Sequence, residues 1–239
     1  MNLWVARGLE ASRLGSHLTD MGRDGIMALF QATAGAAADP IQDPAFARDA
    51  PFDRIDGAAI AAVTNLYREV LPPGGAILDV MAGWVPHLPP EAPYRRVVGI
   101  GIDRHALAEN PFLDEWRVQD LNRDPILPFA GGQFDGATIC AAVQYLARPA
   151  EVIRDIARVL RPGAPLIVTF SNRCLATKAI ACWCLHDETG QLCLVAQHFA
   201  EAGNWADMRC LDRTPPGGGQ PLYAVIGRSL GAGRPAESD

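Results

Sequence analysis

The stretch that decides the fold is AILDVMAGWVPHLP, residues 76–89. It begins as an apolar strand in which Asp79 stands among aliphatic residues, and it breaks at Ala82–Gly83. An apolar strand that ends in an acidic residue and a glycine turn is typical of the nucleotide site of a doubly wound α/β sheet. The turn here continues into Trp84, so a large aromatic side chain stands where a phosphate-binding loop needs small residues.

The segments that follow and precede this stretch predict alternating helices and strands. Helices are expected where apolar residues recur at spacings of three and four, over residues 56–70, 105–110, 150–160, 175–185 and 191–202. Strands are expected at short apolar runs, over residues 76–80, 96–102, 115–118, 134–142, 165–170, 206–212 and 222–228. This pattern predicts a Rossmann-like α/β fold with a seven-stranded, mostly parallel sheet, helices on both faces and a C-terminal antiparallel hairpin.

The two ends of the chain differ from this central region. Residues 1–55 contain scattered glycines, an Ala-rich run and the turn-favouring pairs Asp39–Pro40 and Asp43–Pro44. We expect an N-terminal helical or irregular arm there, which either simply covers the domain or acts as a lid over its site. Residues 56–230 are expected to form the α/β domain, and the polar residues 231–239 a frayed tail.

Composition narrows the classes of function. The chain has 239 residues and a net charge of −6, which argues against nucleic acid as the main partner because no basic stripe neutralises phosphates. No secretion signal and no run of 18 apolar residues is found, so no membrane association is expected. The six cysteines include no CxxC pair and are expected to be reduced thiols in a cytoplasmic protein. The sequence leaves the oligomeric state open.

Three of these cysteines are close in sequence, at positions 174, 182 and 184. They are either a thiol site for a soft ligand or small buried hydrophobic residues. On a helix, Cys182 and Cys184 would point to different faces, and no His/Cys spacing matches a zinc site. No metal site is therefore expected.

Four segments together resemble the class I S-adenosylmethionine-dependent methyltransferases of the type 11 kind. They are LDVMAGWV at 78–85, the end of the second strand at 97–103, QDLNRDPILPFAGGQFD at 119–135, and 150–163 with IARVLRPG. The last two are the most specific, and all four occur in the family's order across 56–228. The resemblance implies an enzyme that binds S-adenosylmethionine and transfers its methyl group to a small-molecule substrate.

The sequence departs from this family at two places. The family has glycines at alternate positions after the first acidic residue, where this chain has Met81, Gly83 and Val85. The family's ribose-binding acid aligns with Gly101, so Asp103 becomes the candidate for that contact. S-adenosylmethionine carries no phosphate, which relaxes the need for three glycines, and Gly83 still permits close backbone approach or a positive φ. Met81 and Gly83 are therefore expected in the cofactor turn.

The resemblance also implies cofactor contacts at the ends of four strands. Asp79 is expected to hold the cofactor's ammonium group, its alternative being a cap of the next helix. Trp84 either forms a wall of the pocket beside the methionine part of the cofactor or packs against a helix. Asp120 is expected to accept from the adenine amino group, with Leu121 touching the ring through its amide, unless Asp120 only caps a turn. Ala141 is expected to meet the cofactor through its backbone.

The catalytic candidates are few because methyl transfer is an in-line displacement that needs at most one general base. Gln144 and Tyr145 follow the fourth strand and are candidates for substrate contact or proton handling, and the alternative for Tyr145 is packing against the next helix. His87 is a candidate general base, and its alternative is a structural role.

Two other functions stay open from the sequence. The chain could be a methyltransferase-like protein that no longer methylates and serves as a binding or partner module, with Trp84 filling the adenosyl pocket. A nicotinamide-dependent dehydrogenase fits less well, because Gly83 alone cannot build the turn that binds a pyrophosphate.

Overall fold

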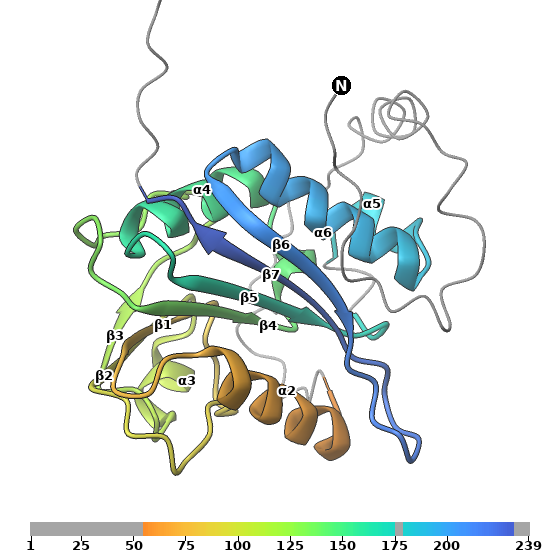
Figure 1. Ribbon diagram of the computed structural model, residues 1–239, viewed down its shortest axis with the longest axis horizontal. Coiled ribbons are helices and arrows are strands. Elements are labelled where there is room, and N and C mark those ends of the chain that lie inside the picture. The colour runs from red at the N-terminus through yellow and green to blue at the C-terminus, as the bar shows by residue number, and fades with distance from the viewer. Residues whose placement is uncertain (1–54, 175–178, 232–239) are drawn as a thin grey trace, which may run out of the picture.

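The computed structural model describes residues 55–174 and 179–231 (Figure 1). The expected arm over 1–54 and tail over 232–239 lie outside the described residues. The described helices and strands are α2 (Gly57–Val70), β1 (Ala76–Val80), β2 (Arg96–Gly101), α3 (Arg104–Glu109), β3 (Glu115–Val118), β4 (Gly136–Cys140), the 3₁₀ helix η2 (Val143–Tyr145), α4 (Pro149–Val159), β5 (Pro165–Phe170), α5 (Ala181–Cys184), α6 (Glu188–Ala202), β6 (Trp205–Asp212) and β7 (Tyr223–Ser229).

The seven strands form one sheet in the order β3-β2-β1-β4-β5-β7-β6. Strands β1 to β5 pair in parallel, and the β6–β7 hairpin is antiparallel, which confirms the predicted fold class. The last strand, β7, lies between β5 and β6 and pairs antiparallel with β5. The two edge strands of the sheet are therefore β3 and β6, and the hairpin extends the parallel part by two strands.

Each face of the sheet buries its own apolar cluster. Helices α4 and α6 cover one face and α2 covers the other (Figure 1). On the first face, Ile156 of α4 and Phe199 of α6 are almost completely buried; on the second, Val63 and Tyr67 of α2 are equally so. Burying one such side chain contributes on the order of 1.5–3 kcal/mol, so all three helices are firmly attached to the sheet.

Helix α2 starts where the sequence predicts. The carboxylate of Asp56 accepts a hydrogen bond from the Ala59 amide at 2.8 Å and so caps the helix. The same carboxylate accepts from the Gln220 amide at 2.8 Å, which joins the helix to the loop before β7. These backbone hydrogen bonds lower the pKa of Asp56.

The connection from β1 to β2, residues 81–95, contains no helix. Four of its residues are prolines, at positions 86, 89, 90 and 93, and a proline inside a helix removes a hydrogen bond and clashes with the preceding turn. The coil is attached to α2 instead. The Thr64 hydroxyl donates to the His87 carbonyl at 3.0 Å, and Arg68 forms an ion pair with Glu91.

The helix predicted over 175–185 is present only in part. Residues 175–178 lie outside the described part, and of residues 179–185 the four in Ala181–Cys184 are α-helical. The next helix, α6, begins at Glu188, three residues before its predicted start, because the Asp187 carboxylate accepts from the Gly190 amide at 2.8 Å and caps it there. Among the described residues, the longest apolar helices are too short or too polar to cross a bilayer.

Candidate functional site

The strand order reverses between β1 and β4, which are hydrogen-bonded neighbours. Open α/β sheets bind their ligands outside the carboxyl ends of the strands at such a reversal. We call the carboxyl ends of β1 and β4, with Met81 and Ala141 directly beyond them, the switch-point edge. The predicted cofactor residues of both strands meet at this edge.

Both strands leave the switch-point edge through a strained residue. Met81 has a φ of 59° and Ala141 a φ of 48°, and Asp207 in β6 is the one other non-glycine with a positive φ among the described residues. A left-handed backbone costs a non-glycine residue roughly 1–2 kcal/mol. Such residues persist where the surrounding structure holds them, and they concentrate at functional sites. Met81 thus has the backbone conformation that favours glycine, at a position where the resembled family has one.

The turn after Met81 is held against β2 and the end of α3. The Ala82 amide donates to the Ile100 carbonyl at 2.9 Å, and the Asn110 side-chain amide donates to the Gly83 carbonyl at 2.7 Å. Gly83 does not have a positive φ, and a Cβ placed on it would meet no atom within 4 Å. Neither the backbone nor packing requires a glycine here, so close approach of a ligand stays the prediction for Gly83.

The missing ribose-binding acid has a steric cause. A Cβ on Gly101 would lie 2.5 Å from the Ala82 carbonyl oxygen, so the turn after β1 occupies the space that a side chain at 101 would need. Asp103 is half-buried, and its Oδ1 accepts from the amides of His105 at 2.8 Å and Ala106 at 3.2 Å. Asp103 therefore caps α3, and a ribose contact through its other oxygen stays a prediction.

Asp79 lies at the carboxyl end of β1 and is half-buried. Its Oδ1 accepts a hydrogen bond from the Thr138 hydroxyl on β4 at 2.9 Å. Burial raises the pKa of Asp79, while the charge of His87 and the Thr138 hydrogen bond oppose that rise. The alternative role of Asp79 as a cap of the next helix is wrong, because no helix follows β1 before β2. A desolvated carboxyl with one donor from a neighbouring strand is suited to a cationic ligand group.

His87 and Trp84 lie in the coil beyond β1 and are both half-buried. The effect of His87 on the pKa of Asp79 places its imidazole within electrostatic reach of that carboxyl. The Trp84 ring meets the His105 ring edge to face, with centroids 5.2 Å apart. Trp84 therefore packs toward the first turn of α3, and it contributes to neither of the two buried apolar clusters.

Asp120 follows β3 and is half-buried, while the next residue, Leu121, is buried. Asp120 Oδ1 accepts from the Asn122 amide at 3.0 Å, and the exposed Arg123 lies 3.5 Å from Oδ2. The turn-capping alternative is thus present in the structure, and the contacts of Asp120 and Leu121 with adenine stay predictions.

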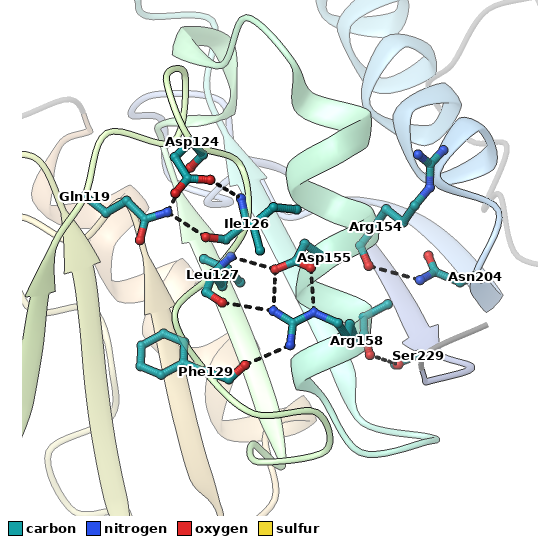
Figure 2. Close-up of polar contacts among 11 residues, drawn as sticks. Gln119, Asp124, Ile126, Leu127, Phe129, Arg154, Asp155, Arg158, Asn204 and Ser229 are labelled. Atoms are coloured by element: carbon teal, nitrogen blue, oxygen red, sulfur yellow. Dashed lines mark hydrogen bonds and ion pairs between the residues drawn. The ribbon is translucent and has the colours of Figure 1, made fainter. Parts of the chain in front are cut away.

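A polar network holds the loop that carries Asp120 (Figure 2). The Arg158 guanidinium of α4 donates to both carboxylate oxygens of Asp155, at 2.6 and 2.8 Å, and to the carbonyls of Leu127 at 2.9 Å and Phe129 at 2.8 Å. The Leu127 amide donates in turn to Asp155 at 2.7 Å. The loop after Asp120 is therefore fixed to α4 by charge-assisted hydrogen bonds from a half-buried Arg158, which is paired with the nearly buried Asp155.

Gln144 and Tyr145 form the 3₁₀ helix after β4 and are both fully buried. The Gln144 side-chain amide donates to the Ala141 carbonyl at 3.1 Å, while its Oε1 has no partner among the described residues. The Tyr145 carbonyl accepts from the Asn122 side chain at 2.9 Å. Gln144 thus contacts the strained residue of β4 directly, and substrate contact or proton handling by either side chain stays a prediction.

The cysteines after β5 are poor candidates for thiolate chemistry at neutral pH. Burial, followed by the neighbouring Cys184 thiol, raises the pKa of Cys174 to about 11, and burial raises the pKa of Cys182. Within residues 55–174 and 179–231, no group of three or more His, Cys, Asp or Glu side chains is arranged to hold a metal ion.

The structure adds residues that the sequence reasoning missed. Thr138 was read only as part of a buried strand, yet it contacts Asp79. Ile102 and Val118, at the carboxyl ends of β2 and β3, are 43% and 50% exposed although apolar. Ile102 directly follows β2, and Val118 is the last residue of β3.

Residues 81–168 match the family model described as "Methyltransferase domain". None of the curated proteins compared with the chain matches its sequence. The matched segment begins at the strained Met81 and ends within β5, so it contains the strand ends β2 to β4 and the whole of α4.

Several solved structures share the fold at low identity. A Mesorhizobium loti S-adenosylmethionine-dependent methyltransferase is 16% identical, with a TM-score of 0.51 over 72% of this chain and 100% of that one. The [4+2]-cyclase SpnF is 16% identical, with a TM-score of 0.54 over 86% and 93%. A chain of the Haloferax volcanii complex of the Trm112 methyltransferase activator with a protein described as a methyltransferase is 16% identical, with a TM-score of 0.52 over 70% and 89%.

Proposed function

Because this chain carries a class I S-adenosylmethionine-dependent methyltransferase domain, we propose that it transfers the methyl group of S-adenosylmethionine to a small-molecule nucleophile by in-line displacement. The observation that carries the proposal is the switch-point edge. Two strained residues, Met81 and Ala141, stand there beside Asp79, a desolvated carboxyl that faces a neighbouring strand's hydroxyl.

The residues at this edge fit the cofactor's chemistry. S-adenosylmethionine has a cationic amino-acid end, and the Asp79 carboxylate would hold its ammonium group by charge-assisted hydrogen bonds. The open space beside Gly83 leaves room for close approach. Asp120 would accept from the adenine amino group, and the backbone at Leu121 and Ala141 would contact the adenine ring and the ligand chain.

The cofactor, when bound, supplies a methyl group on a cationic sulfur. This chain's residues would orient the two reactants and exclude water. Trp84, half-buried against His105, would form one wall. His87, in the coil beyond β1, would in its neutral form take the proton that a methyl acceptor must lose.

A small-molecule acceptor is the class that the charge favours. The net charge of −6 works against a polyanionic substrate such as nucleic acid. The acceptor atom itself, whether oxygen, nitrogen, sulfur or carbon, is not specified by these residues.

A second candidate function is supported by the departures at Met81 and Gly101. These positions lack the glycine and the acid of the resembled family, so a member that binds without methylating is the alternative. The SpnF structure, whose fold this chain shares, is described as a cyclase, which supports the alternative by showing another reaction on this fold.

Calorimetry with S-adenosylmethionine, and with its demethylated product, tests the proposal. We expect binding by the full chain, and weaker binding by Asp79→Ala and Asp120→Ala. Arg123→Ala, which removes the exposed ion-pair partner of Asp120, is the matched control and should bind normally. Absence of binding at millimolar ligand would overturn the proposal, and binding without methyl transfer to any acceptor in a broad panel of small nucleophiles would favour the alternative.

A further inference from the structure

A side chain of β4 holds the carboxyl of β1 at the switch-point edge. Asp79 and Thr138 are direct partners in the parallel register of β1 and β4. The Thr138 hydroxyl donates to Asp79 Oδ1 at 2.9 Å, and Thr138 is completely buried. The contact is therefore fixed by the sheet itself and does not depend on a mobile surface side chain.

This contact lies in a small polar layer on the α2 face of the sheet. The Tyr67 hydroxyl of α2 is buried beside the Thr169 hydroxyl of β5 and the Cys140 thiol of β4, without a well-formed hydrogen bond to either. Burial and the nearby Asp79 and Cys140 hold the pKa of Tyr67 well above its usual range, so Tyr67 is neutral. From the β1–β2 coil, His87 is the group whose positive charge acts on Asp79.

The surroundings of Asp79 thus have opposite effects on the pKa of its carboxyl group. Removal from water favours the neutral carboxyl, and it is the largest influence on Asp79. The Thr138 hydroxyl donates a hydrogen bond, which favours the ionised carboxylate. Only the ionised form attracts an ammonium group, so the donor on β4 decides over which pH range Asp79 is ready for such a ligand.

We propose that Thr138 is a positioning residue that keeps the Asp79 carboxylate ionised and oriented for the cofactor's ammonium group. The inference rests on the proposed function, because it assigns the ligand of Asp79. It adds a residue outside the cofactor turn, on the neighbouring strand, whose side chain need not touch the cofactor.

The test is the pH dependence of cofactor binding by Thr138→Val, a nearly isosteric change that deletes the hydroxyl. Thr169→Val is the matched control. Thr169 is equally buried and on the same face, one strand further along, and its hydroxyl lies 3.5 Å from the Ile139 carbonyl. Calorimetry with the demethylated product would cover about pH 5.5 to about pH 7.5, below the range where an α-amino group loses its proton.

We expect Thr138→Val to bind roughly ten-fold more weakly than the wild type at the acid end, with the gap narrowing as the pH rises. The sign follows from the carboxyl: without its donor the pKa of Asp79 rises further, so more of it is neutral at low pH. The ratio of the two affinities, Thr138→Val to Thr169→Val, removes any pH effect that the two variants share. Thr138→Ser, which restores the donor, should restore the wild-type profile.

The outcomes separate the two claims. If the wild type binds neither S-adenosylmethionine nor its demethylated product, the proposed function fails. If the wild type binds and Thr138→Val has the same affinity and pH profile as Thr169→Val, the role of Thr138 is overturned while the proposed function stands. Should Thr138→Val not fold, Thr138→Ala deletes the same hydroxyl from a smaller side chain and is judged by the same comparison.

Discussion

The two connections that flank the switch-point edge are built in different ways. Residues 81–95, between β1 and β2, form a helix-free coil with four prolines. Residues 141–164, between β4 and β5, contain η2 and α4, and α4 carries the ion pair between the half-buried Arg158 and the nearly buried Asp155 (Figure 2). Yet both connections begin with a left-handed non-glycine residue, Met81 and Ala141.

The comparison shows that two connections of unlike structure share one backbone feature at this edge. The β4–β5 connection follows the resembled family closely and is held by side-chain bonds to the backbone. The β1–β2 connection departs from the family's glycine pattern, yet its first residue, Met81, has the same left-handed conformation as Ala141. Backbone geometry at the strand ends is therefore the common feature, and the means of holding it differ.

The largest effect that would test this comparison is the loss of Arg158. Arg158→Ala leaves the nearly buried Asp155 carboxylate unpaired and frees two carbonyls of the Asp120 loop, and we expect it to lower the free energy of unfolding by about 3 kcal/mol. Arg68→Ala breaks the exposed pair that attaches the β1–β2 coil to α2 and should cost less than about 1 kcal/mol. Urea unfolding of both variants measures the difference, and equal losses would contradict the contrast.

The next effect concerns the space beside the first turn. Gly101→Ala places a Cβ 2.5 Å from the Ala82 carbonyl oxygen, so the turn must move, and we expect a loss of about 2 kcal/mol in unfolding free energy. Because the turn carries the predicted cofactor contacts, cofactor affinity should fall as well. A thermal unfolding curve and a calorimetric titration check both expectations, and a variant as stable as the wild type would show that the turn is not packed there.

A smaller effect measures the strain at Met81. Met81→Gly relieves the left-handed backbone and loses a half-buried side chain, whereas Met81→Ala loses nearly the same side chain and keeps the strain. The glycine variant should be more stable than the alanine variant by about 1 kcal/mol. Ala141→Gly should likewise be more stable than the wild type by about 1 kcal/mol in unfolding free energy. If alanine at 81 proves as stable as glycine, the left-handed conformation of Met81 is not present in solution.

The smallest expected effect on stability is at Gly83. A Cβ there meets no atom within 4 Å, so Gly83→Ala should change the unfolding free energy by less than about 0.5 kcal/mol. Cofactor affinity should nevertheless fall roughly ten-fold, because the added methyl group would occupy ligand space. Unchanged affinity would remove Gly83 from the cofactor site and leave Met81 as the turn's significant residue.

Much of the fold could be predicted from local patterns. The spacing of apolar residues fixed the helix at 57–70, and the apolar runs fixed all seven strands to within a few residues. The hairpin was expected from its short loop, but its insertion order, with β7 beside β5, depends on long-range pairing that no local pattern records. Within the described residues, the helix expected over 175–185 is limited to Ala181–Cys184, and Asp187 starts a new helix directly after it.

The candidate site was predictable in outline only. The acidic residue and the glycine turn located the edge, and Gly101 was recognised as a departure. Its cause, the Ala82 carbonyl, lies on a different strand's turn and needs the structure. The positive φ of Met81 was equally hidden, because a methionine gives no sign of a left-handed backbone, and Thr138 meets Asp79 only through strand register.

The prolines between β1 and β2 have a further consequence for how a ligand would be received. Each proline limits the conformations of the unbound coil, so little ordering entropy remains to be lost when a ligand arrives. A pre-organised coil of this kind favours tight binding from few contacts and an association that requires no slow rearrangement of residues 81–95. The same rigidity would limit the ligand shapes that the coil of residues 81–95 can fit. The coil would therefore discriminate between related ligands through its fixed shape.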